Sequence, residues 1–246
     1  MFRLDNKIAI VTGAARGIGR AIARTFAAQG ARLALVDVLF DEVSALAAEL
    51  GDGARAYQAD LSVVEEIECL VEAVTGDFET IDILVNNAGI CPRLPFVDST
   101  EADWDKLVNI NAKSQYFLMQ AVRPIMKVGG GGRIVNMASA AGRVGSVANA
   151  SIYSGTKGAV VMFSKAVARE VASDGILINC VAPGCIDTDL INNLPPEKVQ
   201  ALCDQIPVKR LGKTEEVASV VAFLASDEAS YLTGAVIDVS GGWIMP

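Results

Sequence analysis

Short apolar runs recur along the chain and alternate with longer segments of helical character. Six runs are strong and a seventh is weaker; they span residues 7–12, 32–38, 81–86, 133–139, 175–182 and 235–239, with the weaker one at 54–59. Strands that are apolar on both faces are typical of a buried parallel sheet. The helical segments between them span residues 18–28, 41–50, 63–78, 101–126, 152–172 and 214–224. This alternation predicts an α/β fold, a doubly wound parallel sheet of about seven strands with helices on both faces.

The whole chain, residues 1–246, is expected to form one domain. Folds of the α/β class reach this length as single units, and no stretch rich in Pro, Gly and Ser divides the sequence. The longest stretch without a strand covers residues 183–213 and contains Pro183, Pro195 and Pro207. A segment of that length is more often a binding loop than a neutral connection, so we expect 183–213 to form a substrate-binding loop or lid.

Charge and cysteine content argue against several classes of partner and site. Lys and Arg number 21 against 29 Asp and Glu, a net charge of −8 at pH 7, which disfavours binding to nucleic acid or anionic lipid. The five cysteines are odd in number and contain no Cys-x-x-Cys, so we expect neither a disulfide framework nor a metal site. No uncharged stretch reaches membrane-spanning length. We expect a soluble, cytoplasmic protein with no membrane or nucleic-acid partner.

The sequence contains no histidine. This absence removes Ser-His-Asp and Cys-His nucleophilic catalysis, His-ligated metals and every imidazole general base. Proton transfer near neutral pH then falls to a carboxylate, a lysine, a cysteine or a tyrosine whose pKa is displaced from its usual value.

A glycine-rich turn follows the first predicted strand and leads directly into a helix. Its pattern is Gly-x-x-x-Gly-x-Gly, with Gly13, Gly17 and Gly19 after Thr12. Glycines let the backbone turn tightly and approach a pyrophosphate, and the N-terminal end of the helix attracts the anion. A glycine cluster alone also serves ordinary strand-to-helix turns, but its place within a βαβ unit favours dinucleotide binding.

Asp37, at the end of the second predicted strand, bears on the choice of cofactor. A carboxylate there accepts hydrogen bonds from the adenosine ribose and repels a 2′-phosphate, so NAD(H) is favoured over NADP(H). Arg16 in the glycine turn is the opposing signal, because a guanidinium there would meet a 2′-phosphate. Val38 adds no second positive charge, and we give Asp37 the greater weight.

Tyr153 and Lys157 lie four residues apart on a predicted helix, so they project from one face. Ser139 ends the preceding strand, at the carboxyl edge where open α/β sheets build their sites, and Asn111 lies in the helix before that. Hydride transfer between an alcohol and nicotinamide needs a base for the hydroxyl proton and a dipole for the oxygen. Tyr153 supplies the first and Ser139 the second, provided that Lys157 and the positive nicotinamide ring lower a phenol pKa of about 10 towards 7.

These motifs, in this order, resemble those of the short-chain dehydrogenase/reductases over nearly the whole chain. The residues that carry the resemblance are Thr12 to Gly19, Asp60, Asn86 to Gly89, Asn111, Ser139, Tyr153 to Lys157, Pro183, Gly184 and Thr188. The resemblance implies a Rossmann-like fold and a catalytic tetrad of Asn111, Ser139, Tyr153 and Lys157. It also implies that Lys157 binds the nicotinamide ribose and that Asn111 holds a water in the proton relay.

The same resemblance implies a set of cofactor contacts. They are Gly13, Arg16, Gly17, Ile18, Gly19, Asp37, Asp60, Leu61, Asn87, Ala88, Gly89, Tyr153, Lys157, Pro183, Gly184, Ile186 and Thr188. Among these, Asp60 is expected to contact the adenine and Thr188 the nicotinamide carboxamide. The family's usual assembly implies a homotetramer whose dimer contacts use the fourth and fifth helices. The loop between Ser139 and Tyr153 is slightly longer than expected of the family, which affects the shape of the pocket.

Candidate substrate-pocket residues are mostly small or apolar, which indicates a modest, largely hydrophobic alcohol or ketone. They are Cys91, Pro92, Leu94, residues 140–145, Asn149, Cys185, Ile186, Leu190, Ile191, Leu194 and residues 243–246. Arg93 and Arg143 are the nearby cations that would meet a substrate anion, although such residues are more often solvated loop charges.

The predicted function is that of an oxidoreductase that transfers a hydride between NAD(H) and a secondary alcohol or ketone. Within the same family, the alternative is an NADPH-dependent 3-oxoacyl-(acyl-carrier-protein) reductase, which Arg16 favours and Asp37 opposes. Outside the enzymes, the alternative is a protein that senses NAD(H) without catalysis. Ser139, Tyr153 and Lys157 argue against the sensor, which has no need of a base beside the nicotinamide.

Overall fold

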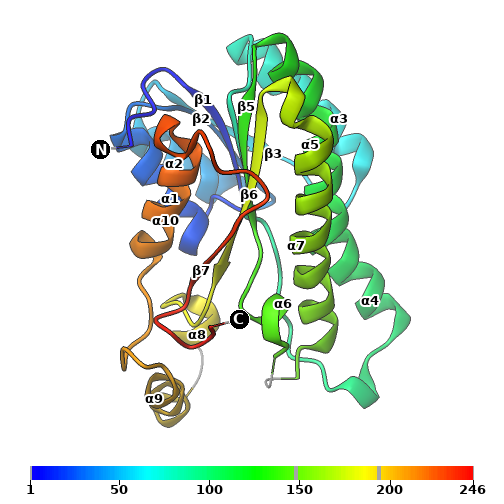
Figure 1. Ribbon diagram of the computed structural model, residues 1–246, viewed down its shortest axis with the longest axis vertical. Coiled ribbons are helices and arrows are strands. Elements are labelled where there is room, and N and C mark those ends of the chain that lie inside the picture. Colours follow the sequence, from blue (N-terminus) through cyan, green and yellow to red (C-terminus); the bar gives the residue numbers. More distant parts are fainter. Residues whose placement is uncertain (1, 147–148, 193–194, 246) are drawn as a thin grey trace.

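The computed structural model describes residues 2–146, 149–192 and 195–245, and its centre is a seven-stranded sheet (Figure 1). Neighbouring strands pair in parallel, in the order β3-β2-β1-β4-β5-β6-β7. The strands are β1 (Ile8–Thr12), β2 (Arg32–Asp37), β3 (Ala54–Gln58), β4 (Ile83–Asn86), β5 (Gly132–Met137), β6 (Ile176–Pro183) and β7 (Val236–Val239). The predicted α/β fold with a parallel sheet of seven strands is confirmed.

Helices cover both faces of the sheet. One face carries α1 (Gly17–Ala28), α2 (Phe40–Leu50) and α10 (Thr214–Ala225), and the other carries α3 (Val64–Phe78), α5 (Ser114–Val128) and α7 (Ser151–Val171) (Figure 1). Successive strand side chains point to opposite faces, so Ala9 and Val11 join the first core while Ile8 and Ile10 join the second. Burial on both faces explains the uninterrupted apolar runs that predict these strands.

The predicted helix over residues 101–126 is interrupted. α4 (Glu101–Val108) runs into a π-helical turn, Asn109–Lys113, before α5 begins at Ser114. A π turn closes its hydrogen bonds over five residues and leaves the composition of the helix unchanged, so apolar periodicity does not reveal it. The turn matters because Asn111, a predicted catalytic residue, lies at its centre.

The segment 183–213 is more regular than the sequence suggests. It contains α8 (Asp189–Asn192) and α9 (Pro196–Gln205). Pro196 occupies the start of α9, where the missing N–H of proline costs no hydrogen bond. Pro195 and Pro196 therefore begin a helix rather than exclude one, and the assignment of 183–213 as a substrate-binding loop or lid stays a prediction.

The centre of the sheet is the point at which the strand order reverses. β1 and β4 are neighbours there, and the chain continues from β1 to β2 on one side and from β4 to β5 on the other. Open α/β sheets bind ligands in the crevice at the carboxyl ends of such strands. The glycine turn follows β1 and residues 87–89 follow β4, so both lie at this crevice. Further along, α6 (Ala141–Val144) and α8 lie at the same end of the sheet, the lower end in Figure 1.

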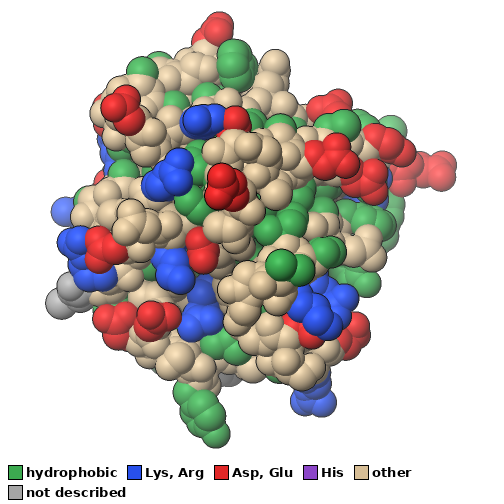
Figure 2. Space-filling view, turned by 90° about the horizontal axis from the view of Figure 1, so that it is seen from above, with side chains coloured by type: hydrophobic (Ala, Val, Ile, Leu, Met, Phe, Trp, Pro, Cys, Tyr) green, Lys and Arg blue, Asp and Glu red, His purple; other side chains and the backbone are tan. Residues whose placement is uncertain are grey.

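The surface carries charges of both signs. Acidic and basic side chains are interspersed on the face shown in Figure 2. None of the helices in the described part of the chain combines the length and the hydropathy needed to span a bilayer.

Candidate active site

The glycine turn after β1 is held against the end of β4 by side-chain hydrogen bonds. The Thr12 hydroxyl accepts hydrogen bonds from the backbone N–H groups of Asn87 and Ala88, both at 3.0 Å, and donates to the Val85 carbonyl at 3.3 Å. The Asn87 amide donates in return to the carbonyls of Thr12 and Gly13, at 2.9 and 3.1 Å. These reciprocal bonds fix the two loops that border the crevice.

Glycine is required in this turn by the course of the backbone. Gly13 and Gly17 have φ angles of +63° and +55°, in the left-handed region. A Cβ on Gly19 would lie 2.0 Å from the Gly13 carbonyl oxygen and 2.6 Å from Asn87 Nδ2, closer than any side chain allows. The turn therefore leaves a cradle that only a bare backbone can form.

The cradle fits the phosphates of a dinucleotide. α1 begins at Gly17 with no side-chain cap and no acidic residue in its first turn. Its first N–H groups and the positive end of its dipole are consequently open to an anion. Arg16, the residue before α1, is exposed and adds a positive charge beside the turn. The backbone of residues 13–19, including Ile18, would hold the phosphates.

Asp37 lies at the end of β2 beside the same turn. Its Oδ2 accepts a hydrogen bond from the Ala15 N–H at 3.0 Å, and its Oδ1 accepts one from the Leu39 N–H at 3.1 Å. The carboxylate therefore orders the glycine turn, a structural task that sequence reasoning missed. Each carboxylate oxygen has a second lone pair, so a ribose hydroxyl still fits there.

Asp60 and Leu61 follow β3, the next strand towards the sheet edge. Asp60 is exposed, and its Oδ1 accepts a hydrogen bond from the Ser62 N–H at 2.9 Å, whereas Leu61 is buried. The structure thus brings the predicted adenine side, Asp37 and residues 60–61, to the carboxyl ends of adjacent strands.

Ser139 and Tyr153 meet on the other side of the crevice. Ser139 lies two residues beyond the end of β5, and Tyr153 lies in the first turn of α7. A side-chain hydrogen bond joins them, and Tyr153 is half-buried. The two hydroxyls that the sequence predicts as partners are therefore adjacent.

Lys157 is buried one turn further along α7. Its Nζ donates a hydrogen bond to the Met137 carbonyl at 2.7 Å and lies 3.5 Å from the place of a Cβ on Gly89. A Cβ on Gly142 would lie 2.5 Å from the Lys157 carbonyl carbon, so α6 packs directly on this part of α7. Met137 and Gly142 position Lys157, and the sequence offered no signal for the first because its backbone makes the contact.

The protein groups alone hold the phenol protonated. Burial raises the pKa of Tyr153 to about 12, and the hydrogen bond with Ser139 acts in the opposite direction. Burial lowers the pKa of Lys157 to about 8. The Lys157 ammonium lies 5.9 Å from the centroid of the Tyr153 ring and is not among the groups that lower the pKa of Tyr153. The lowering expected from Lys157 together with the oxidised nicotinamide ring stays a prediction.

Asn111 is committed to a backbone clamp. Its Oδ1 accepts a hydrogen bond from the Ile90 N–H at 2.8 Å, and its Nδ2 donates to the Ile90 carbonyl at 2.9 Å and to Thr156 Oγ1 at 3.4 Å. Asn111 is fully buried. It joins the π turn both to the loop after β4 and to α7, and neither Ile90 nor Thr156 was predicted to take part.

The loop after β6 completes the crevice. β6 ends at Pro183, the Gly184 N–H donates to the Val239 carbonyl at 3.0 Å, and Ile186 is buried. Thr188 Cγ2 lies 3.7 Å from the place of a Cβ on Gly17, so this loop reaches the glycine turn. Leu194 and Pro246, and the side chain of Leu190, were predicted to line the pocket and lie outside the described residues.

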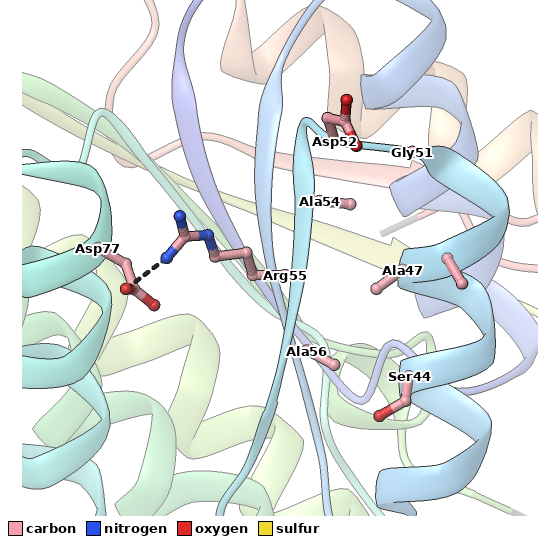
Figure 3. A pocket seen from close by; sticks show the side chains of 9 residues that line it. Ser44, Ala47, Gly51, Asp52, Ala54, Arg55, Ala56 and Asp77 are labelled. Atoms are coloured by element: carbon pink, nitrogen blue, oxygen red, sulfur yellow. Dashed lines mark ion pairs between the residues drawn. The ribbon is translucent and has the colours of Figure 1, made fainter.

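A separate hollow at the sheet edge does not belong to this site. Figure 3 shows it between α2 and β3, walled by Ala47, Ala54 and Ala56, with Arg55 pointing towards its ion-pair partner Asp77. None of the residues predicted for catalysis or cofactor binding lines it. No group of His, Cys, Asp and Glu in the described ranges is arranged to hold a metal ion.

Known proteins are similar to this chain over its whole length. A family described as enoyl-(acyl carrier protein) reductase matches residues 13–244. The chain is 41% identical over 245 residues to nodulation protein G of Rhizobium sp. (strain N33), covering 100% of both chains. It is 39% identical over 241 residues to the 3-oxoacyl-acyl-carrier-protein reductase FabG of Escherichia coli (strain K12), covering 98% of each. With the parallel sheet and the order of its motifs, the chain therefore belongs to the short-chain dehydrogenase/reductase family, oxidoreductases that use nicotinamide cofactors.

Proposed function

We propose that the protein transfers a hydride between NAD(H) and a secondary alcohol or ketone, with Tyr153 as the general acid and base. One observation carries the proposal: the hydrogen-bonded pair of Ser139 and Tyr153, with buried Lys157 behind it, borders the crevice beside Gly89. A site that held the cofactor only for recognition would not need a phenol at this place.

The residues divide the chemistry between them. Tyr153 is protonated at neutral pH and donates its proton to a ketone oxygen, while the Ser139 hydroxyl holds that oxygen. Lys157 and Asn111 keep α7 and the loop after β4 in place around the pair. A bound nicotinamide supplies or accepts the hydride and, when oxidised, adds the positive charge that alcohol oxidation requires beside the phenol.

Replacing Tyr153 by Phe tests this assignment. We expect Tyr153→Phe to reduce turnover by about a thousandfold, because it removes the proton donor, and to leave the Kd for NADH nearly unchanged. Turnover is followed by NADH absorbance with a panel of ketones and secondary alcohols, and Kd by NADH fluorescence. Retained activity in the variant would contradict the role of Tyr153. Complete inactivity of the wild type, with NADH still bound, would favour the sensor.

NAD(H) is the proposed cofactor because Asp37 places a carboxylate beside the glycine turn. A 2′-phosphate there would face a like charge, which Arg16 on the exposed side offsets only in part. We expect initial rates with NADH to exceed those with NADPH by about tenfold or more. A preference for NADPH would overturn this choice.

The names of the relatives favour a second candidate, reduction of 3-oxoacyl thioesters. The Escherichia coli and Vibrio cholerae relatives, 39% and 40% identical, are both named 3-oxoacyl-acyl-carrier-protein reductase. Initial rates with a 3-oxoacyl thioester and with a simple cyclic ketone of similar size separate the two candidates. A kcat/KM higher for the thioester and dependent on NADPH would select the second.

We also propose a homotetramer, as the family resemblance implies. A groove between α5 and α7 is lined by Tyr116, Arg123 and Glu170, and Met162 on α7 is 65% exposed. Such a face supports contact between copies of the chain. Light scattering is expected to report the mass of four chains, and the mass of one chain would contradict it.

A single domain in the cytoplasm is the remaining part of the proposal. Two cores packed on the faces of one sheet support one domain, and five free cysteines support a reducing compartment. Unfolding in denaturant is expected to show one transition by fluorescence and circular dichroism. Two separated transitions would argue against one domain.

A further inference from the structure

Two arginines were predicted to lie near the mouth of the crevice, and the structure distinguishes them. Arg143 of α6 forms an ion pair with Asp238 of β7, with 3.4 Å between the guanidinium Nη1 and the carboxylate Oδ1. The Asp238 carboxylate therefore neutralises the charge of Arg143 within the protein. Arg93 is exposed, and its side chain has no hydrogen-bond or ion-pair partner within residues 2–146, 149–192 and 195–245. In a chain of net charge −8, Arg93 is a local exception to the repulsion of anions.

The segment that carries Arg93 is fixed between two parts of the site. At its start, Ile90 is clamped by the Asn111 amide. At its end, the Leu94 N–H donates to the Asn149 carbonyl at 2.7 Å, and Leu94 forms a parallel bridge with Ala150. Ala150 directly precedes α7, which carries Tyr153. Arg93 therefore directly precedes Leu94, the residue that pairs with Ala150 at the start of α7.

The charge of Arg93 acts on both substrate-side loops. Burial raises the pKa of the Cys91 and Cys185 thiols, and Arg93 opposes this effect at both. Cys91 also interacts with Tyr153 and lies in the loop after β4, whereas Cys185 lies in the loop after β6. The charge of Arg93 therefore reaches groups in the loop after β4, which carries it, and in the loop after β6.

We propose that Arg93 determines specificity by binding an anionic group, a carboxylate or a phosphate, at the end of the substrate remote from the reacting carbon. The inference rests on the proposed function and narrows its substrate class from a hydrophobic ketone to a ketone or secondary alcohol that carries an oxyanion. The planar guanidinium pairs with both oxyanions through two parallel hydrogen bonds.

A pair of ketones that differ in one charge tests Arg93. 4-Oxopentanoate and its methyl ester share the reacting carbonyl, and both are assayed with NADH. We expect the wild type to have the higher kcat/KM for the acid. In Arg93→Gln the ratio of acid to ester is expected to fall about fivefold to tenfold, with the ester value unchanged, and Arg93→Lys is expected to restore part of the ratio.

Arg169→Gln is the matched control. Arg169 is an exposed arginine near the opposite end of α7, and its replacement removes the same charge about 24 Å of helix away from Tyr153. The acid-to-ester ratio is expected to stay at its wild-type value. A second ketone pair, 4-hydroxy-2-butanone and its phosphate ester, distinguishes the two oxyanions: a larger effect of Arg93→Gln on this pair assigns the phosphate.

Binding without turnover separates this inference from the proposed function. The Kd of 4-oxopentanoate is measured by calorimetry in Tyr153→Phe, with and without Arg93→Gln. A Kd about fivefold weaker supports Arg93 even if the wild type reduces neither ketone, a result that would reject the proposed function alone. An unchanged Kd, or an equal loss of kcat/KM for acid and ester, would reject the role of Arg93 even if the ketones are reduced.

Discussion

The turn after β1 and the segment after β6 border the same crevice and are packed in opposite ways. In the turn, Gly19 is buried and its hydrogen atom stands where a Cβ would overlap the Gly13 carbonyl. In the segment, no residue of α9 is buried, and the buried apolar side chains lie outside it, at Ile186, Ile191 and Ile206. We infer that the predicted cofactor side of the crevice is formed by tightly packed backbone, whereas the predicted substrate side includes a loosely packed helix, α9.

The largest expected effect comes from adding a side-chain carbon to the glycine turn after β1. Gly19→Ala is expected to lower the free energy of unfolding by about 3 kcal/mol, because its Cβ would lie 2.0 Å from the Gly13 oxygen and the turn has to move. The displaced turn is also expected to lose NADH binding. Denaturant unfolding and NADH fluorescence measure the two effects.

Gly76→Ala is the control for that substitution. Gly76 lies in α3 with no atom within 4 Å of the place of its Cβ, so alanine is expected to raise the free energy of unfolding by about 0.5–1 kcal/mol. If Gly19→Ala raises the free energy of unfolding as Gly76→Ala does, the turn after β1 is not rigid and does not differ in packing from the segment after β6.

The same difference in packing decides what could be predicted from the sequence. Apolar runs predict β1, β2 and β6 to within one residue at each end because these strands are buried on both faces. The glycine turn and the pairing of Ser139 with Tyr153 were also predictable, since both depend on residue type and spacing. α9 was missed because a helix without a buried face leaves no apolar periodicity.

Contacts made by backbone atoms had no signal in the sequence. The Met137 carbonyl holds Lys157, and the backbone of Ile90 holds Asn111, but any residue type supplies the same atoms. The pKa of Tyr153 could not be predicted either, because its direction depends on how far burial outweighs the neighbouring charges.

The buried charge of Lys157 on α7 predicts a conflict between stability and activity. Burial lowers the pKa of Lys157 from 10.5 to about 8, so the folded protein binds this proton less well than the unfolded chain does. Below pH 8 the full destabilisation is present, about 3 kcal/mol, and stability recovers as the pH rises from 8 to 10.5. Lys157→Met is therefore expected to be more stable than the wild type at pH 7, by up to that amount, and inactive.

Denaturant unfolding of both proteins from pH 7 to pH 10.5 measures this difference. The advantage of Lys157→Met is expected to shrink across that range, because the wild type loses its buried charge. Lys106→Met, at an exposed position of α4, is the control and is expected to show no pH-dependent difference. A constant advantage of Lys157→Met at every pH would mean that packing, and not the charge, is responsible.

The smallest expected effect comes from a substitution in α9, the helix without buried residues. Leu202 of α9 is half-buried, so Leu202→Ala is expected to lower the free energy of unfolding by less than about 1 kcal/mol. Leu84→Ala in fully buried β4, the same substitution, is expected to cost about 3 kcal/mol. On the prediction that α9 belongs to the substrate-binding segment, Leu202→Ala is expected to raise KM for a ketone about two- to threefold, because apolar contact is partly lost, while the Kd for NADH stays constant. A loss of NADH affinity equal to the change in KM would show that the turn after β1 and the segment after β6 are coupled.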